Sequence, residues 1–394
     1  MIGFEEAVAR IVALALPLGS ERVPIELAAG RTLAAPLMAR SSMPAQNVSA
    51  MDGYAVRDAD MQPVPFNLPV CGESFAGSNP SIVLTPGTAC RIFTGAPVPE
   101  GADRVIVQEN IERDANKARV VRPYGPGRNI RMAGSDFRKG DVLLQAGHRL
   151  DWRSMTTAAA ADRRDLEVFR AARLVILATG DELAAPGHAH ERAGAIPESV
   201  SFGIQSLAEG GGAQVLRSLR LPDDRDILRP AASSALADAD LVVVIGGASV
   251  GEKDYSREMF SEKLDYVFPK VAIKPGKPVW LAQIGRRLIL GLPGNPTSAL
   301  VTARLFLAPL LAGLSGRNPM DTLAFGSRCC LDALPQTGDR ETFLRALRTE
   351  AGVTLAISQD SSSQTTLAHS NVLIRREPGA PALVPGEDVT VLDF

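Results

Sequence analysis

Two short, uninterrupted apolar runs set the strongest limit on the fold of this chain. Residues 174–177 and 241–245 contain no polar side chain. Such runs are typical of strands that are buried on both faces of a parallel sheet, because a strand with one wet face alternates polar and apolar residues. Helical patterns at 199–209 and 224–236 lie between the runs. The sequence therefore predicts a three-layer α/β domain, with helices covering a central sheet.

Three further segments complete the predicted sheet. Residues 214–219 form a weaker strand pattern, and 271–273 and 288–290 are short apolar runs. Together with the first two runs, they predict a sheet of five mostly parallel strands.

The rest of the chain has a different character, and 394 residues are too many for one core. Residues 4–16 and 153–161 have helical spacing, 43–131 is β-rich and broken by Pro and Gly, and the tail from 329 alternates in short segments. The predicted fold class is therefore multidomain α/β plus β. The predicted domains are a discontinuous helical linker domain (1–40 and 132–172), an inserted β module (41–131), the α/β domain (173–317) and a C-terminal β domain (318–394).

Composition excludes several classes of protein. A net charge of −2 without long runs of one sign argues against a nucleic-acid surface. Four cysteines without CxxC spacing predict neither a disulfide framework nor a zinc site. Glu5 and Glu6 stand where a signal peptide needs positive charge, and the apolar stretch 300–314 is too short to span a membrane. We therefore expect a cytoplasmic protein that binds neither membrane nor nucleic acid.

Two loops stiffened by Pro and Gly predict an anion site. The first contains Lys274 and Lys277, and the second, 293–298, opens a helix pattern. Ammonium groups, backbone N–H groups freed by glycine and a helix N-terminus all favour an anion. The alternative is two tight turns with solvated lysines.

In an open parallel sheet, ligands bind at the carboxyl ends of the strands. Loops 179–183, 246–251, 274–278 and 293–298 all follow predicted strands, so we expect them on one edge. None reads GxGxxG or GxxxxGK[ST], so neither a dinucleotide site nor a P-loop is indicated.

Carboxylates accompany the lysines at this edge: Glu182, Asp223 and Asp254. They would repel a bare anion, whereas Mg²⁺ could bridge carboxylates to phosphate oxygens. The alternative is that each acid caps a helix or pairs with an arginine. The β module has polar clusters of its own at 47–55, 91–99 and 127–136. The first contains Asp52 and the last Asp136, although both could be turn formers.

These motifs, taken together and in order, resemble the MoeA family of molybdopterin molybdenumtransferases, which includes the gephyrin E domain. The resemblance covers nearly the whole chain. The matching segments are 49–55, 94–99, 179–183, 246–251, 274–278 and 293–298.

The resemblance implies a four-domain homodimer whose helical domain serves dimerisation and whose active site lies between the α/β domain of one subunit and the β module of the other. It implies insertion of molybdate into adenylated molybdopterin, with Mg²⁺-dependent release of AMP. Expected partners are a molybdopterin adenylyltransferase and apo-molybdoenzymes or their chaperones.

The resemblance also assigns roles to residues of this chain. As catalytic residues it implies Asp52, Thr94, Asp136, Glu182 and Asp254, and as Mg²⁺ ligands Glu182, Asp223 and Asp254. As substrate- or molybdate-binding residues it implies Gly246, Gly247, Ser249, Lys270, Lys274, Lys277, Pro278, Pro293, Asn295, Ser298, Arg345 and Ser363.

Two positions depart from the family pattern. Ser135 stands where the family usually has Glu, and Val200 stands near a usual Asn. These changes remove a carboxylate and a side-chain hydrogen bonder. The alternative function is a non-catalytic carrier or binding protein for molybdopterin or the molybdenum cofactor. A third hypothesis is an unrelated nucleotide-dependent α/β enzyme.

Overall fold

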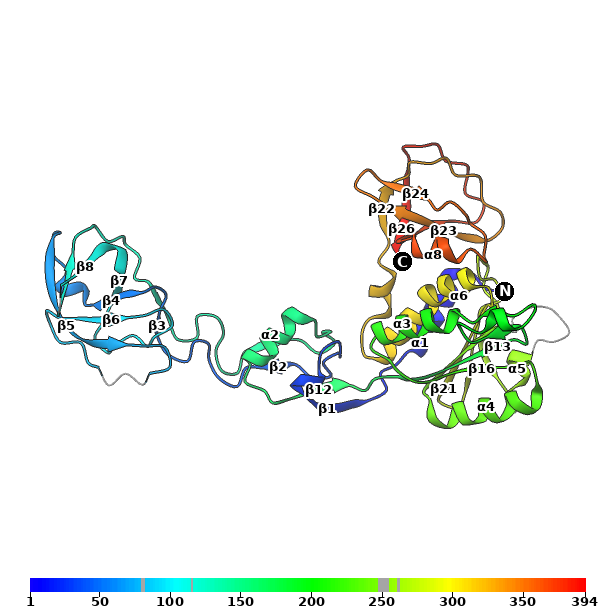
Figure 1. The fold of residues 1–394 in the computed structure, drawn as a ribbon, viewed down its shortest axis with the longest axis horizontal. Helices are drawn as coiled ribbons and strands as arrows, with labels where there is room; N and C mark the ends of the chain where they lie inside the picture. Colours follow the sequence, from blue (N-terminus) through cyan, green and yellow to red (C-terminus); the bar gives the residue numbers. More distant parts are fainter. Residues whose placement is uncertain (79–81, 115, 247–254, 261–262) are drawn as a thin grey trace.

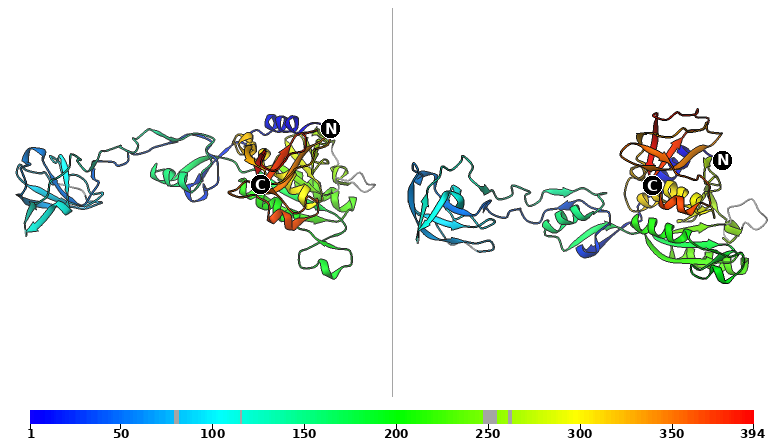
Figure 2. Two further views of the ribbon diagram at one scale, coloured as in Figure 1. Left: turned by 90° about the horizontal axis from the view of Figure 1, so that it is seen from above. Right: turned by 45° about the horizontal axis from the view of Figure 1, so that its top comes forward.

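The chain forms an elongated molecule (Figure 1). The computed structural model describes residues 1–394 except 79–81, 115, 247–254 and 261–262. The α/β domain and the C-terminal β domain lie together at one end, the β module lies at the other, and a small linking domain lies between them. Figure 2 shows the same separation from two further directions. The predicted multidomain α/β plus β class is confirmed.

The α/β domain contains a six-stranded sheet in the order β16-β13-β17-β21-β20-β18. All neighbouring strands pair in parallel except β20, which is antiparallel to both of its neighbours. The strands are β13 (Arg173–Thr179), β16 (Gln214–Leu221), β17 (Leu241–Ile245), β18 (Asp265–Phe268), β20 (Trp280–Ile284) and β21 (Arg287–Leu292).

Helices cover both faces of this sheet, as the three-layer prediction requires. Helices α3 (Val200–Gly210) and α7 (Ala308–Leu314) contribute to the core on one face. Helix α4 (Arg225–Asp238) packs through Leu228, Ala232 and Ala235 on the other face.

One predicted strand of this sheet was wrong. Residues 271–273 do not join it; instead β19 (Ile273–Lys274) pairs with β23 (Glu341–Arg348) of the C-terminal domain. Val271 and Ile273 are fully buried in the core that the two domains share. Their burial produced the apolar run, but burial alone does not say which sheet a strand joins. The edge is filled instead by β20 and β18.

The core of the α/β domain also draws on the N-terminus. Helix α1 (Phe4–Leu14) buries Phe4, Val8 and Ile11 in the same core as α7. Residues within the predicted first domain, 1–40, therefore contribute to packing of the α/β domain.

A long apolar helical stretch runs through the centre of this core. It consists of α6 (Pro296–Thr302), a π-helical segment (Ala303–Leu307) and α7. By length and composition its 19 residues could cross a membrane, but 83% of the apolar window is buried inside the protein. The stretch is therefore longer than predicted from sequence, and its apolar character is explained by its central position in the core.

Asp240 anchors the start of β17 among three arginines. Its carboxylate accepts hydrogen bonds from the Arg170 guanidinium at 2.9 and 3.1 Å, from the Arg173 backbone N–H at 2.9 Å and from Arg287 Nη1 at 3.1 Å. Burial alone would raise the pKa of Asp240, but these hydrogen bonds outweigh it and lower the pKa. Arg170 follows the last strand of the linking domain, so the cluster also ties the two domains together.

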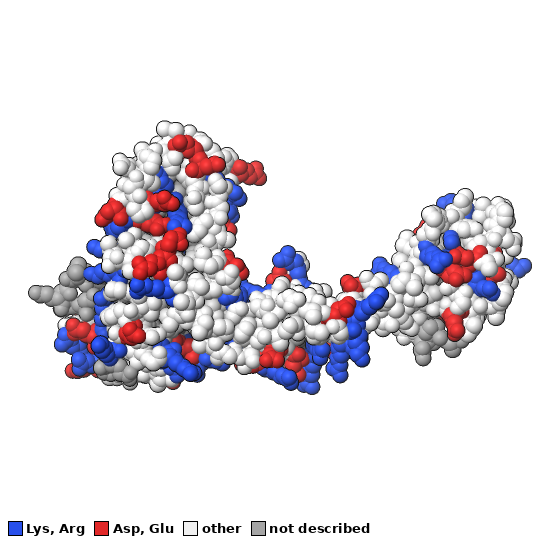
Figure 3. All heavy atoms as spheres, turned by 180° about the vertical axis from the view of Figure 1, so that it is seen from behind, with Lys and Arg blue, Asp and Glu red and all other residues white. Residues whose placement is uncertain are grey.

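The linking domain is built from two short strand pairs and one helix. Strand β1 (Ser20–Pro24) pairs with β12 (Asp165–Phe169), and β2 (Leu37–Met38) pairs with β11 (Val142–Leu144). Asp151 caps helix α2 (Trp152–Ala160) by accepting from the Ser154 N–H. Figure 3 shows Lys and Arg side chains gathered along one side of this domain, and charges of both signs over the rest of the visible surface.

The β module is an insertion with closely spaced ends. Its sheet has the order β7-β4-β6-β5-β9-β8. The strands that lead in and out, β3 (Val48–Ser49) and β10 (Ile130–Arg131), pair antiparallel, and Met43 bridges to Phe137 below them. The sheet strands are β4 (Gly53–Val56), β5 (Phe66–Ser74), β6 (Ala89–Ile92), β7 (Arg104–Val107), β8 (Ile111–Asp114) and β9 (Lys117–Val120).

The C-terminal domain contains another six-stranded sheet, and it packs against the α/β domain. Its order is β19-β23-β25-β26-β22, with β24 paired to β23. Between β24 and the short helix α8 (Gln364–Ala368), a polar segment of the chain reaches back toward α6. The remaining strands are β22 (Gly326–Cys329), β24 (Val353–Leu355), β25 (Val372–Arg376) and β26 (Asp388–Asp393).

Candidate functional site

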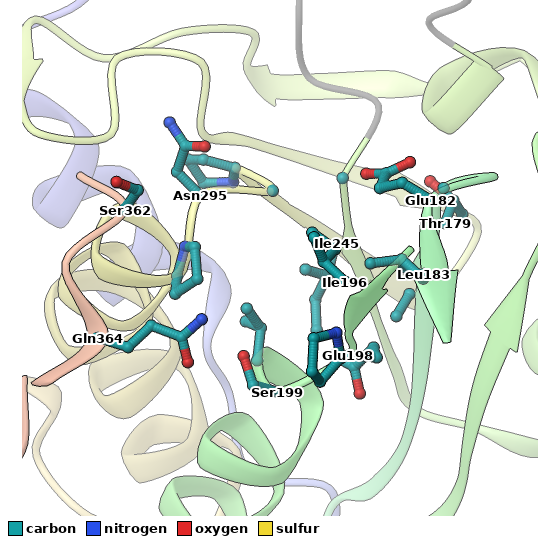
Figure 4. Close-up of a pocket in the computed structure, with 18 of the residues that line it drawn as sticks. Thr179, Glu182, Leu183, Ile196, Glu198, Ser199, Ile245, Asn295, Ser362 and Gln364 are labelled. Carbon is teal, nitrogen blue, oxygen red and sulfur yellow. The ribbon is translucent and has the colours of Figure 1, made fainter. Parts of the chain in front are cut away.

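A pocket of about 630 Å³ lies at the carboxyl ends of β13, β17 and β21 (Figure 4). We call it the sheet-edge pocket. Figure 4 shows Thr179 and Glu182 on one side of the pocket and Asn295, Ser362 and Gln364 on the opposite side. The loops after three parallel strands meet here, as the rule for open parallel sheets predicts.

The fourth predicted loop reaches the same edge for a different reason. Residues 274–278 do not follow a strand of this sheet, which corrects the prediction; they precede β20. Because β20 is antiparallel to β21, with Trp280 opposite Gly291, the start of β20 lies beside the end of β21. Pro278 consequently lines the sheet-edge pocket together with Pro293.

Gly246 allows two strand ends to approach closely at the floor of the pocket. Its φ is +95°, and a Cβ atom there would lie 2.5 Å from the Thr179 carbonyl oxygen. A side chain at this position is excluded by both conformation and contact. Thr179 is 5% exposed, and within the described part of the chain its hydroxyl has no hydrogen-bond partner. This hydroxyl is a pocket-lining group that the sequence prediction did not single out.

Among the described residues, three carboxylates line the sheet-edge pocket, and they differ in the hydrogen bonds that they make. Glu198 accepts from both the backbone N–H (2.8 Å) and the hydroxyl of Ser201, so it holds the first turn of α3. Glu182 is exposed, and its carboxylate folds over Gly180. Asp223 presents its backbone N–H to Asp181 Oδ1 at 3.1 Å. Glu182 and Asp223 thus line the same pocket, and their predicted role as Mg²⁺ ligands stays a prediction.

A second pocket of about 390 Å³ adjoins the first at Pro278, which lines both. Lys274 and Lys277 are exposed at its rim, and Ser298 from α6 contributes a buried wall. We call this the lysine pocket. The predicted Lys270 lines neither pocket; its carbonyl accepts from the Ile2 N–H, and Val271 after it turns into the core.

Arg345 on β23 brings a buried positive charge to the lysine pocket. Arg345 is 1% exposed, and its Nη2 donates to the carbonyls of Ser358 at 3.1 Å and Asp360 at 3.2 Å. Burial lowers the pKa of Arg345, and Asp360 opposes this shift. Among the described residues, Arg345 Nε has no hydrogen-bond partner. A positively charged donor with an unused N–H suits an oxyanion.

Residues 361–364 of the C-terminal domain close the gap between the pockets. Asn295 Nδ2 donates to Ser361 Oγ at 3.0 Å, and the Thr297 N–H donates to the Ser361 carbonyl at 3.1 Å. The predicted Ser363 instead stabilises this loop: its hydroxyl pairs with that of Thr366 at 2.7 Å, and it lines neither pocket. Ser361 and Gln364 line the pockets, but no motif in this serine-rich loop revealed them.

The predicted residues of the β module divide into a close pair and a separate residue. The Thr94 backbone N–H and hydroxyl donate to Asp52 Oδ1 at 2.7 and 2.8 Å, and in that order they lower the pKa of Asp52. Asp136 lies in an exposed turn beyond β10, where its N–H donates to the Met43 carbonyl. Figures 1 and 2 show the whole module far from the α/β and C-terminal domains, whose residues line the sheet-edge pocket of the same chain.

Three predicted residues, Gly247, Ser249 and Asp254, lie outside the described residues. Their predicted roles in binding substrate, catalysis and Mg²⁺ coordination stay predictions.

Comparison with known proteins identifies the family that has this architecture. The model of the MoeA N-terminal region (domain I and II) matches residues 2–161, that of a probable molybdopterin binding domain matches 175–313, and that of the MoeA C-terminal region (domain IV) matches 329–394. The chain belongs to the MoeA family. The predicted family is thereby confirmed, and with it a transferase of molybdenum cofactor biosynthesis.

Individual relatives support this MoeA assignment. The chain is similar to the molybdopterin molybdenumtransferase of Haemophilus influenzae, with 37% identity over 77% of this chain and 75% of the relative. The enzyme of the same name from Nostoc sp. is 32% identical over 95% of this chain and 89% of the relative. The solved structure of the MoeA protein from Pyrococcus horikoshii is 25% identical, covers 100% of both chains and has a TM-score of 0.84.

Proposed function

We propose that this chain inserts molybdate into adenylated molybdopterin and releases AMP. The observation that carries the proposal is the pair of adjoining pockets that meet at Pro278, one lined by carboxylates and the other by lysines and a buried arginine. AMP leaves when water hydrolyses the phosphoanhydride bond that joins it to molybdopterin. Positioning and charge neutralisation should dominate this chemistry.

The lysine pocket suits molybdate, which is a tetrahedral dianion. Lys274 and Lys277 supply charge at the rim, and Arg345 supplies a directional donor from the wall. Charged donors make shorter and stronger hydrogen bonds to oxyanions than neutral ones. The pocket would therefore hold molybdate next to the substrate phosphates in the sheet-edge pocket.

Mg²⁺ fits the sheet-edge pocket through Glu182 and Asp223. Among the described residues, no group of three or more His, Cys, Asp or Glu side chains is placed to hold a metal. Two carboxylates suffice for Mg²⁺, because it usually completes its shell with waters and substrate phosphates. When bound, it would neutralise charge that develops as the phosphoanhydride breaks.

A test of turnover uses the purified full chain with Mg²⁺, molybdate and adenylated molybdopterin, and measures AMP by chromatography. AMP release is expected, and Lys274→Ala should raise the molybdate concentration needed for it. Lys139→Ala is the control, because this exposed linking-domain lysine lines neither pocket. Absence of AMP from the wild-type protein at near-physiological molybdate would contradict the proposal.

We also propose that the partner subunit of a homodimer supplies Asp52 and Thr94 to each site. The remoteness of the module from its own pockets supports this arrangement. At a molybdate concentration too low for the Lys274→Ala site, dimers that pair an Asp52→Asn chain with a Lys274→Ala chain would contain one working site, and about half the wild-type rate is expected. The control places both substitutions on one chain beside a wild-type partner, which breaks both sites. Equal activity of the two mixed dimers, or higher activity of the control, would refute sharing.

The carrier alternative rests on Val200, which is 7% exposed, lines the sheet-edge pocket and offers no hydrogen bond. Ser135 lies in the exposed turn before Asp136. Tight binding of adenylated molybdopterin without AMP release would favour this alternative. A molybdopterin adenylyltransferase and apo-molybdoenzymes as partners, and a cytoplasmic location, stay predictions.

A further inference from the structure

The β module has a pocket of its own beside the Asp52–Thr94 pair. It has a volume of about 210 Å³ and lies where β4 begins and β6 ends. Gly53, next to Asp52, and Phe93, next to Thr94, both line it. The Gln108 backbone N–H donates to the Asp52 carbonyl at 3.0 Å, so the pocket wall that contains Gln108 is bonded to the Asp52–Thr94 pair. We call this the module pocket.

The module pocket has an apolar floor and a polar rim. Tyr54 and Ile92 are 4% and 0% exposed, and the half-buried Ile111 completes the floor. An apolar cavity with a few converging polar groups is typical of a small-molecule site. The groups on its rim are Arg91, Gln108, Glu109 and Arg113.

One wall of the pocket is flat. The Phe75 ring stacks on Phe93 at 4.8 Å with an interplanar angle of 13°, and the Arg91 guanidinium lies over Phe93 at 5.0 Å. Because Phe75 covers one face of Phe93, we place Arg91 over the other face, toward the pocket. Glu73 contacts Arg91 at 3.7 Å and Arg113 at 3.4 Å across partly exposed side chains, so these weak ion pairs leave both guanidinium groups able to bind a ligand.

We propose that the module pocket binds the planar heterocycle of adenylated molybdopterin, stacked on the Arg91 guanidinium, which Phe93 supports from its other side. This inference rests on the proposed function. Planar bases stack on aromatic rings and guanidinium planes. At about 210 Å³, the pocket is smaller than the roughly 300–1,000 Å³ of pockets that enclose whole ligands, so it takes one end of the substrate.

The rim favours the pterin over the adenine end. A pterin presents an amino group and a ring N–H side by side, and a carboxylate can accept from both. Glu109 supplies such a carboxylate at the rim, while Gln108 and Arg113 can donate to the neighbouring ring oxygen. Adenine, the other planar ring of the substrate, offers one amino group on its hydrogen-bonding edge and no adjacent ring N–H.

The test compares Glu109→Gln with Glu112→Gln. Glu112 is the matched control, because Ile111 and Arg113 on either side of it line the pocket, whereas Glu112 points away and pairs with Arg119 at 3.3 Å. Glu109→Gln should raise the KM for adenylated molybdopterin about tenfold or more without lowering kcat, since a hydrogen bond to a charged group is lost. Glu112→Gln should change neither constant.

Direct binding distinguishes the two rings. Pterin-6-carboxylate fluorescence and AMP calorimetry are measured on the full chain, with Arg91→Met as a second variant. If the variants bind the pterin more weakly and AMP as well as the wild type does, the pocket binds the pterin. If they bind AMP more weakly and the pterin unchanged, the pocket still binds a heterocycle, but that heterocycle is adenine. The inference is overturned if the variants leave both the KM for adenylated molybdopterin and the binding of both probes unchanged. It is also overturned if the wild-type protein binds neither probe and releases no AMP. Variant-sensitive pterin binding without AMP release would refute only the proposed function.

Discussion

Replacing Arg345 with Met isolates the contribution of a buried guanidinium to oxyanion binding. Arg345 is 1% exposed and lines the lysine pocket, and Met is similarly long but uncharged. Arg345→Met removes two hydrogen bonds to the carbonyls of Ser358 and Asp360. Both of these residues lie in a solvent-accessible loop, so water can replace the lost donors. The free energy of unfolding should therefore fall by only about 1 kcal/mol.

The effect on the anion should be larger. A hydrogen bond between a charged donor and its acceptor contributes about 1.5–3 kcal/mol, which corresponds to a roughly 10- to 150-fold rise in the molybdate concentration for half-maximal AMP release. Arg345→Lys keeps the charge but loses the fork of donors, so it should fall between the wild type and Arg345→Met.

The assay titrates molybdate at saturating adenylated molybdopterin and follows AMP, with thermal unfolding measured in parallel. Arg348→Met is the control, because Arg348 lies on the same strand, pairs with Asp393 and does not line the pocket. An unchanged molybdate requirement in a folded Arg345→Met protein would refute the assignment of molybdate to this pocket.

Three further predictions concern stability and ionisation. Asp240→Asn should lower the free energy of unfolding by about 1.5–3 kcal/mol, because three partly exposed arginines lose the charge of the buried carboxylate. The lowered pKa of Asp240 places its stabilisation above the ordinary carboxyl pKa, so in the wild type this stabilisation is lost as pH falls through the folded pKa. Denaturant titrations across acidic pH will check both effects. Gly276→Ala should cost about 2–5 kcal/mol, since φ is +98° and the new Cβ would lie 2.1 Å from Thr302 Cγ2; an unshifted melting temperature would contradict this. Thr94→Ala should raise the pKa of Asp52 only part of the way to its ordinary value, because the backbone N–H bond remains; a carboxyl NMR titration measures it, and no shift would exclude the hydroxyl as a cause.

Strong local patterns made much of the fold predictable. The runs at 174–177 and 241–245 became central strands because only burial on both faces tolerates such composition. The run at 271–273 failed as a strand of this sheet, since an apolar run records burial but not the sheet that provides it. Strand β20 was missed, and its pairing depends on the hairpin with β21 rather than on a distinctive pattern.

The candidate site was predictable where it follows strand ends. Glu182 and Asn295 were found because loops after parallel strands converge on one edge. Ser361 and Gln364 were missed, because they come from another domain and lie in a serine-rich loop without a motif. The Asp240 cluster was missed for a related reason: its arginines come from separate elements, and spacing along the chain does not encode their meeting.

The pairing of β3 with β10 has a consequence for the history and engineering of this chain. Ser49 and Ile130 lie opposite each other, so the β module begins and ends at nearly one point in space. A tight turn of about two residues could join these strands as a hairpin and leave the linking domain intact. The same closeness would let the module be grafted, exchanged or expressed alone, as insertions with adjacent ends generally can be. A recombination event at this neck could thus replace the module that carries Asp52 and Thr94 without disturbing the domain that holds the sheet-edge pocket.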